Sequence, residues 1–229
     1  MTTKRLDNIE ACVFDAYGTL FDVNAAAAHC AEELGDKWQA LADTWRLKQL
    51  QYTWLRSLMQ CHTDFWQVTG DALDYAMETH GIADADLRKR LMDLYLTLDA
   101  YEEVADVLAT LKGSGLKTAI LSNGAPGMLK AAADNAGISA SLDAIISVED
   151  IKIFKPHPSV YQMAVEQLDV VAECISFQSS NAWDASAAAT FGFRVVWINR
   201  FGQARERLPD DPDVEIKTLR GLPAIVGAK

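Results

Sequence analysis

Short apolar runs recur along the chain and alternate with longer segments in which the apolar positions have helical spacing. The runs are rich in Val, Ile and Phe, as expected of buried strands. They cover residues 11–14, 117–121, 144–147, 174–177 and 193–199, with a weaker run at 214–217. Because strands that alternate with helices form parallel sheets with crossover helices, the pattern predicts an α/β fold with a doubly wound, Rossmann-like sheet.

The stretch between the first two runs follows a different pattern. Over residues 23–98 the periodicity is helical only, with Gly70 among the expected helix breaks and Asp84 as an expected N-cap. We therefore expect a helical cap, residues 23–98, that is inserted into a core made of residues 1–22 and 99–229.

Length, charge and cysteine content narrow the class of protein. A chain of 229 residues, half of them hydrophobic, can bury one substantial core and a smaller insert. The net charge of −11 argues against nucleic acid or an anionic membrane as a partner, because both are negatively charged. No run approaches the length of a membrane span, and no apolar leader follows Met1, so we expect a cytoplasmic protein. Buried free thiols, rather than metal ligands or disulfides, are expected at the widely spaced Cys12, Cys30, Cys61 and Cys174.

Polar clusters follow four of the predicted strands. They cover residues 15–19, 122–124, 149–155 and 179–184. Each cluster alone is explained by a turn or a helix cap, in which Asp, Asn, Ser and Gly are common. In a doubly wound sheet, however, ligands bind beyond the carboxyl ends of the strands, so four clusters at one edge indicate a site. Asp15, ionised at neutral pH, is its candidate nucleophile.

The chain resembles the haloacid dehalogenase superfamily in four strings, which are Asp-Ala-Tyr-Gly-Thr-Leu at 15–20, Ser-Asn-Gly at 122–124, Phe-Lys-Pro at 154–156 and Ser-Ser-Asn-Ala-Trp-Asp at 179–184. The last string and the aromatic-rich cap segment 45–55 resemble the L-2-haloacid dehalogenase (type II) subfamily. The resemblance extends over residues 9–223. It implies hydrolytic dehalogenation of short-chain (S)-2-haloalkanoic acids to (R)-2-hydroxyalkanoic acids and halide, through an aspartyl-ester intermediate.

The resemblance also implies roles for single residues. Asp15 would attack the carbon that bears the halogen, Lys155 would keep this carboxylate ionised, and Asp184 would orient the lysine and help to activate water. The same network would include Ser179, Asn181 and Thr19. Substrate carboxylate and halide would contact Ser122, Asn123 and Arg46. The pocket would be lined by Tyr17, Leu50, Phe65 and Trp183, with Tyr161 near the lysine. The resemblance implies no cofactor and no metal, a small-molecule 2-haloacid as substrate, and a homodimer.

Arg46 illustrates what spacing alone provides. On the expected cap helix, Trp38, Trp45 and Tyr52 define one face, and a neighbouring stripe that begins at Arg46 could face the core across a cleft. An arginine on an amphipathic helix usually lies on the solvated face, so without the resemblance Arg46 has no assigned role. Gln178, where an apolar strand residue is expected, has none either. The four histidines form no cluster with metal-ligand spacing.

Two other functions are compatible with the sequence. A phosphatase or phosphonate hydrolase of the same superfamily would share the fold, but such phosphatases carry a second aspartate two residues after the nucleophile as a general acid. This chain has Tyr17 there, and a departing halide needs no proton. A catalytically silent binding protein is the other alternative, against which the intact set of Asp15, Lys155 and Asp184 argues.

Overall fold

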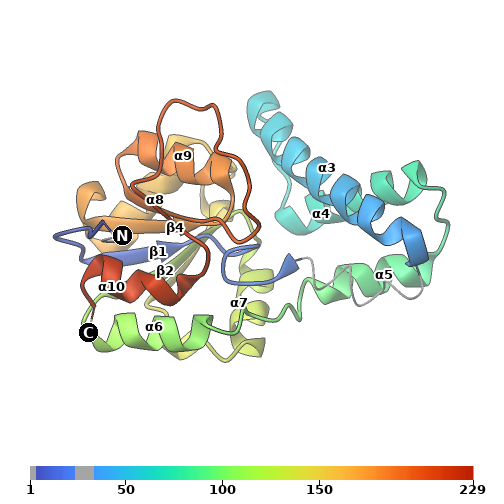
Figure 1. Cartoon of the computed structure of the whole chain (residues 1–229). Helices are drawn as coiled ribbons and strands as arrows, with labels where there is room; N and C mark the ends of the chain where they lie inside the picture. The colour runs from blue at the N-terminus through green and yellow to red at the C-terminus, as the bar shows by residue number, and fades with distance from the viewer. Residues whose placement is uncertain (1–3, 24–33, 229) are drawn as a thin grey trace.

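The computed structural model describes residues 4–23 and 34–228 (Figure 1). Within these residues one parallel sheet has the strand order β3-β2-β1-β4-β5-β6. Its strands are β1 (Ala11–Phe14), β2 (Lys117–Ser122), β3 (Ala144–Ser147), β4 (Ile175–Ser179), β5 (Arg194–Ile198) and β6 (Val214–Ile216). The doubly wound α/β fold that the alternating pattern predicts is confirmed.

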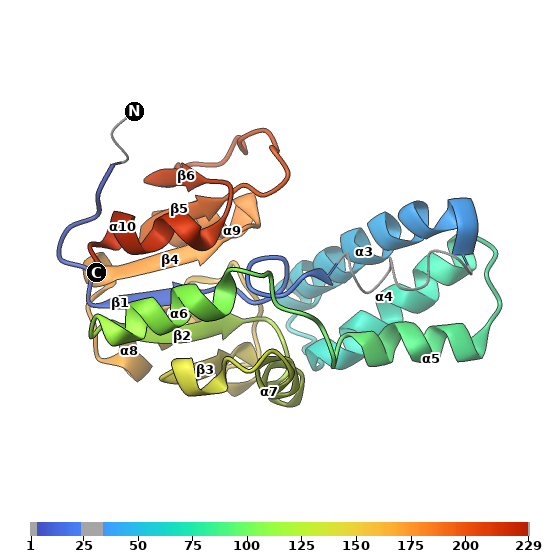
Figure 2. The ribbon, with the colours of Figure 1, turned by 60° about the horizontal axis from the view of Figure 1, so that its bottom comes forward.

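Helices cover both faces of the sheet. One face carries α6 (Val104–Gly113), α7 (Pro126–Asn135) and the short α10 (Leu222–Val226), and the other carries α8 (Pro158–Leu168) and α9 (Ala182–Phe191) (Figure 2). Because the central strand β1 is covered on both sides, its four residues have no exposed surface. That burial explains why β1 is a continuous apolar run rather than an alternating one.

The register of β1 places Asp15 at the edge of the sheet. Phe14 pairs with Ile120 of β2 on one side and with Gln178 of β4 on the other. The amide of Asp15 donates to the carbonyl of Gln178 at 2.9 Å, so the backbone is held up to the residue at which the strand ends. The carboxyl ends of the neighbouring strands β2 and β4 therefore lie on either side of Asp15.

Three helices lie beside the carboxyl edge of the sheet (Figure 1). They are α3 (Trp38–Met59), which follows the 3-10 turn η1 (Gly35–Lys37), α4 (Phe65–Thr79) and α5 (Ala85–Leu94). Asp84 caps α5 as predicted, because its Oδ1 accepts from the amide of Leu87 at 2.8 Å. Residues 24–33, with His29 and Cys30, lie outside the described residues. The division of the chain into cap and core stays a prediction.

The prediction that Gly70 breaks a helix is wrong. Gly70 is buried inside α4, which continues to Thr79. A Cβ at this position would lie 3.1 Å from Arg88 Nη2 and 3.7 Å from the end of Met92, both on α5. Packing of α4 against α5 therefore keeps the helix continuous through Gly70 and outweighs the low helix propensity of glycine.

Two connecting segments join the three helices to the sheet, and they pair with each other. Phe21 pairs with Ala100 in an antiparallel bridge. The amide of Asp22 donates to the carbonyl of Asp99 at 3.0 Å, and that of Tyr101 donates to Leu20 at 3.0 Å. We call residues 20–22 and 99–101 the linker pair.

Two further expectations concern cysteines and membranes. Cys12, Cys61 and Cys174 are free thiols, as expected, but only Cys12 is buried, whereas Cys61 is exposed and Cys174 is half-buried. Among the helices of the described residues, none is long and apolar enough to cross a membrane.

Candidate active site

Asp15 lies at the centre of a dense hydrogen-bonded network. Its carboxylate is almost fully buried, with 6% of the residue exposed. Oδ2 accepts from Asn181 Nδ2 at 2.7 Å, from Thr19 Oγ1 at 3.2 Å and from Ser179 Oγ at 3.4 Å. Because these donors come from the loops after β1 and β4, the two strand ends together fix the orientation of the carboxylate.

Lys155 provides the positive charge of the site. Its Nζ lies 3.2 Å from Asp15 Oδ1 and 2.8 Å from Asp184 Oδ2, and the residue is only 1% exposed. Burial alone would lower the pKa of Lys155, but the two carboxylates outweigh it and raise the pKa above its usual value. The ammonium is therefore charged at neutral pH and bridges the two carboxylates.

Asp184 is fully buried on the first turn of α9. Besides Lys155 it has a second donor, since Tyr161 donates its hydroxyl to Asp184 Oδ1 at 2.7 Å. Burial raises the pKa of Asp184 above its usual value, and the nearby negative charge of Asp15 acts in the same direction, while Lys155 and Tyr161 oppose both. Such a carboxylate is a stronger base than an exposed aspartate.

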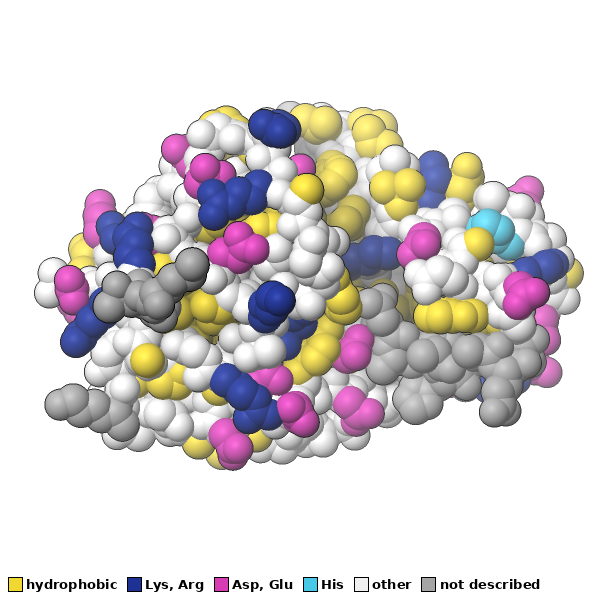
Figure 3. All heavy atoms as spheres, viewed as in Figure 1, with side chains coloured by type: hydrophobic (Ala, Val, Ile, Leu, Met, Phe, Trp, Pro, Cys, Tyr) yellow, Lys and Arg dark blue, Asp and Glu magenta, His cyan; other side chains and the backbone are white. Residues whose placement is uncertain are grey.

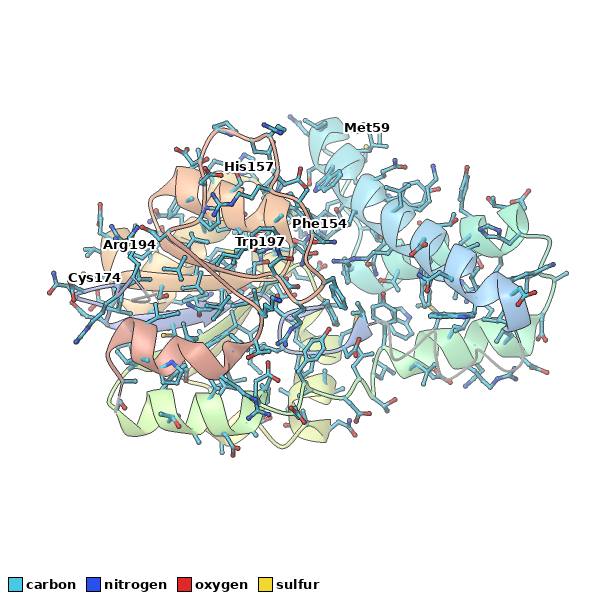
Figure 4. The ribbon with its side chains drawn as sticks, viewed as in Figure 1. Met59, Phe154, His157, Cys174, Arg194 and Trp197 are labelled. Carbon is cyan, nitrogen blue, oxygen red and sulfur yellow. The ribbon has the colours of Figure 1, made fainter. Side chains whose placement is uncertain are left out.

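Arg46 reaches the network from α3. Its Nη2 donates to Asn181 Oδ1 at 3.1 Å, and its Nη1 donates to Gln49 Oε1 at 2.7 Å. Gln49 is itself buried and donates to Thr69 Oγ1 of α4 at 2.8 Å. The stripe that begins at Arg46 faces the core, because Ser57, three turns further along α3, accepts from the amide of Phe154 at 3.1 Å. Figure 4 shows Phe154 between the core and α3.

Ser122 ends β2 and Asn123 follows it, on the other side of Asp15. Both are buried. Ser122 Oγ accepts from the amide of Gly124 at 3.1 Å, and Asn123 Oδ1 accepts from the amide of Lys155 at 2.9 Å. Asn123 thus fixes the backbone of Lys155. This bond uses only the side-chain carbonyl oxygen of Asn123, so the NH2 group of the same side chain does not take part in it.

Aromatic rings form one wall near the site. Tyr17 stacks on Phe65 of α4 with ring centroids 5.7 Å apart, so the expected pair is brought together. Burial raises the pKa of Tyr17 far above its usual value, and its hydroxyl has no hydrogen-bond partner among the described residues. A neutral phenol in this state is a poor proton donor at neutral pH.

Leu50 and Trp183 take no part in the hydrogen-bonded network around Asp15. Trp183 packs edge-on against Trp54 of α3, with ring centroids 5.5 Å apart. Both tryptophans line a groove of about 780 Å³ whose lining also includes Lys155 and Tyr161 but not Asp15. The expected wall function of Trp183 and Leu50 stays a prediction.

Sequence reasoning assigned no role to several residues near the site. Gln49 accepts a hydrogen bond from Arg46. The two residues are three positions apart on one helix, and this spacing could have identified the pair from the sequence. Gln178 lies in the middle of the sheet, where its amide donates to Ser176 Oγ at 2.6 Å and its Oε1 has no partner among the described residues. His157 caps α8, and His62 pairs with Glu149 at 2.9 Å.

The charges of the site define what it can do. In the part of the chain that the structure describes, no group of three or more His, Cys, Asp or Glu side chains is arranged to hold a metal ion. The position between Asp15 and Asp184 holds the Lys155 ammonium instead. A fixed carboxylate beside a permanent positive charge is suited to nucleophilic attack on carbon, and a second, more basic carboxylate is suited to activating water.

Comparisons with known proteins agree with this chemistry. The family model of haloacid dehalogenase-like hydrolases matches residues 9–192. The chain is 45% identical to (S)-2-haloacid dehalogenase 1 of Pseudomonas sp. (strain CBS-3), over 96% of this chain and 98% of that protein. It is 46% identical to (S)-2-haloacid dehalogenase 4A of Burkholderia cepacia, over 88% and 87%. The solved structure of L-2-haloacid dehalogenase from Xanthobacter autotrophicus with covalently bound chloropropionic acid is also similar, with a TM-score of 0.88 and 38% identity over 95% of this chain and 98% of that one.

Proposed function

The chain belongs to the haloacid dehalogenase-like hydrolases, and we propose that within this family it hydrolyses short-chain (S)-2-haloalkanoic acids to (R)-2-hydroxyalkanoic acids and halide. The observation that carries the proposal is the Lys155 ammonium between Asp15 and Asp184. It places a charged nucleophile, its counter-charge and a base in one buried network. Relatives named (S)-2-haloacid dehalogenase that match over nearly the whole chain support the same reaction.

In the first step a carboxylate oxygen of Asp15 attacks C2 of the substrate from the side opposite the halogen. The new C–O bond forms as the C–halogen bond breaks, and the halogen leaves with the bonding electrons as halide. The product of this step is an ester between Asp15 and the substrate, with inverted configuration at C2. In-line alignment of bound reactants can lower a barrier by about 7–11 kcal/mol, so the donors that fix Asp15 carry much of the catalysis.

In the second step water attacks the carboxyl carbon of the ester. Asp184 takes a proton from this water, for which its raised pKa makes it suitable, and Lys155 stabilises the negative charge that develops. The bond between the Asp15 carboxyl carbon and the ester oxygen breaks, so C2 keeps its inverted configuration. The ester oxygen accepts a proton and leaves with the hydroxyacid, and an oxygen from water remains in Asp15.

Substrate groups have two sets of partners in this proposal. Ser122 and nearby backbone amides receive the carboxylate, and the Asn123 amide and Arg46 guanidinium surround the departing halide. The bond from Arg46 to Asn181, which itself contacts Asp15, supports the second assignment. A guanidinium offers charge and hydrogen bonds without losing its own proton at neutral pH.

The reaction is also proposed to be metal-independent. Superfamily phosphatases need an acid two residues after the nucleophile, whereas Tyr17 is a buried phenol with a raised pKa. Lys155 supplies the positive charge that a metal would otherwise supply, and a 2-haloacid carries a single negative charge. These features favour the dehalogenase over the phosphatase or phosphonate hydrolase.

We also propose that the enzyme is cytoplasmic and homodimeric. We expect no nucleic-acid or membrane partner. The acidic net charge supports the absence of polyanionic partners. Trp45 is buried, and Trp38 and Trp54 are half-buried, so these rings are not the most exposed apolar side chains of α3. Apolar side chains instead gather at the end of α3 (Figure 3), where Leu58 is 81% exposed. The neighbouring exposed side chains are Leu55 and Met59. Burial of this patch by a second copy would support a dimer.

The direct test is halide release from 2-chloropropionate, with the L and D enantiomers assayed separately in the presence of EDTA. The proposal predicts chloride from the L enantiomer only and formation of D-lactate. A parallel assay with a phosphate ester and Mg²⁺ provides the contrast. Phosphate release without chloride would replace the dehalogenase by the phosphatase.

A further inference from the structure

A buried ion pair lies close to the active site but outside the hydrogen-bonded network of Asp15. Arg200 follows β5, and its Nη1 donates to Oε1 of Glu103, the residue before α6, at 2.8 Å. The two side chains are 7% and 4% exposed. Burial alone would raise the pKa of Glu103, but the bonds from Arg200 and from the backbone outweigh it and hold the pKa below its usual value. A buried ion pair adds little stability compared with an apolar pair, so stability alone does not account for it.

The second contact of Arg200 reaches the loop of the nucleophile. Its Nη2 donates to the backbone carbonyl of Thr19 at 2.9 Å. Thr19 in turn donates its hydroxyl to Asp15 Oδ2 at 3.2 Å, and the same hydroxyl accepts from the amide of Ser180 at 2.8 Å. Only one residue, Thr19, therefore separates the guanidinium from the nucleophilic carboxylate.

The third contact of Arg200 is with the linker pair. Its Cζ lies 3.7 Å from the ring centroid of Tyr101, which is close enough for a stacked cation–π contact. Tyr101 is joined to Leu20 by a backbone hydrogen bond, and Leu20 is the neighbour of Thr19. Arg200 thus contacts Tyr101 in one connection between the sheet and helices α3–α5, and Thr19, which lies directly before the other.

We propose that Arg200 is a positioning residue for the dehalogenation, which fixes residues 16–21 and, through Thr19, the angle at which Asp15 attacks. The inference rests on the proposed function. The planar fork of an arginine suits the task, because it can serve a carboxylate and a carbonyl at once while its face packs on a ring. Glu103 orients the fork and supplies its counter-charge.

The expected effect is on the rate of the first step rather than on substrate binding. A misplacement of about 1 Å at a reacting group can lower a rate on the order of 100-fold. Arg200→Met should therefore lower kcat by roughly 10- to 100-fold and leave KM within about threefold. Arg200→Lys keeps the charge beside Glu103 but not the fork, so it should fold well and lose a smaller part of the rate.

Arg220→Met is the matched control. Arg220 also pairs with a glutamate of the same segment, since its Nη2 donates to Glu102 Oε1 at 2.6 Å. That pair is exposed, with side-chain exposures of 58% and 83%. Its loss removes an Arg–Glu pair next to Glu103 and leaves Thr19 and Tyr101 untouched.

Single-turnover kinetics with enzyme in excess tests the proposal. The rate constant of halide release at saturating enzyme reports the alignment of Asp15, and circular dichroism with a denaturant titration reports the folded fraction. The proposal predicts a wild-type spectrum with a lowered rate constant for both Arg200 variants, and wild-type values of both for Arg220→Met. A wild-type rate constant in Arg200→Lys, whatever its stability, would mean that the residue is structural only, and would overturn the proposal.

Hydrogen exchange tests the role of Arg200 independently of the proposed function. Backbone amides of residues 16–22 should exchange faster in Arg200→Lys than in the wild type and in Arg220→Met. If the wild type released no halide from any 2-haloacid, the proposed function would fail, and exchange would still decide whether Arg200 holds the loop. Unchanged exchange in this segment would overturn the proposal whatever the activity.

Discussion

Tyr161 donates its hydroxyl to Asp184 at 2.7 Å, and both side chains are fully buried. The bond stabilises the ionised carboxylate and so opposes the rise in its pKa that burial causes. In the proposed mechanism this bond links Tyr161 to the second step without a contact to Asp15. The role of this tyrosine, one turn into α8, stays a proposal.

Replacement of Tyr161 by Phe should make Asp184 a stronger base that is ionised only at higher pH. Without the hydroxyl the pKa of Asp184 rises further, so the acid limb of the kcat profile should move to higher pH. The pH profiles of the two proteins, measured with L-2-chloropropionate, check this. A lower kcat with an unmoved acid limb would show that the hydroxyl does not act through Asp184.

The pH dependence of the wild type follows from the same network. The raised pKa of Asp184 places the acid limb of kcat above pH 3.8, its ordinary value. The raised pKa of Lys155 places the alkaline limb above pH 10.5. Because the groups interact, each limb belongs to the network rather than to one residue. An alkaline limb well below pH 10.5 that Lys155→Arg abolishes would contradict this assignment.

The sign of the pH dependence of stability is the same for Lys155 and Asp184, because folding raises the pKa of both groups, but the pH windows differ. Lys155 gains a partner on folding, so its contribution is complete below pH 10.5 and is lost as the pH rises through its raised folded value. Asp184 binds its proton more tightly in the folded state, so its ionisation lowers stability as the pH rises from 3.8 through its raised folded value. Denaturant midpoints of Asp184→Asn and wild type, compared at pH 4 and pH 7, should therefore diverge in favour of the variant at pH 7.

Removal of Lys155 should cost both activity and stability. Lys155→Met leaves two buried carboxylates without their counter-charge, and loss of one partner from a buried pair costs about 3–5 kcal/mol. Lys152→Met is the control, because Lys152 is three residues away and its side chain is exposed. This variant should match the wild type. Chemical denaturation and halide release measure the two effects. A fully active Lys155→Met would remove the basis of the proposed mechanism.

Two glycines should respond in opposite ways to alanine. A Cβ on Gly124 would lie 2.8 Å from both Leu129 Cδ2 and Tyr17 Cε2, so Tyr17 must shift beside the site. Overpacking of this kind typically costs about 1–3 kcal/mol, and kcat should fall with it. In contrast, the only close neighbour of a Cβ on Gly70 is the flexible end of Arg88, at 3.1 Å.

Gly70→Ala should therefore stabilise the protein. The helix gains about 0.5–1 kcal/mol when alanine replaces glycine, and the Arg88 side chain can move by a few tenths of an ångström. Thermal unfolding of the Gly70 and Gly124 variants, measured side by side, tests both expectations. A lower thermal unfolding temperature for Gly70→Ala would mean that the side chains between α4 and α5 cannot move to accommodate the added methyl group.

The network around Asp15 could be predicted because its members follow strands. Register and strand order bring the segments after β1 and β4 together, so Asp15, Ser179 and Asn181 meet as expected. Lys155 could be expected for a related reason, since it follows the third strand of the same edge. Their roles in catalysis were not derivable from geometry and stay proposals.

Other contacts could not be predicted from local patterns. Arg46 lies on a helix whose orientation relative to the sheet depends on two connecting segments, so spacing left its role open. Glu103 and Arg200 are 97 residues apart, and no periodicity relates them. Gly70 was misjudged because glycine in a helix signals a break unless the neighbouring helix is known.

Single-turnover dehalogenation in heavy-oxygen water tests the central claim most directly. With enzyme in excess over L-2-chloropropionate, the proposed mechanism transfers an oxygen atom of Asp15 to the product and replaces it with one from water. Mass spectrometry of the peptide that contains Asp15 should therefore show one heavy oxygen in that carboxyl group, and the lactate should carry none. Label in the lactate with an unlabelled Asp15 would mean that water attacks the substrate itself, and would contradict the aspartyl-ester mechanism.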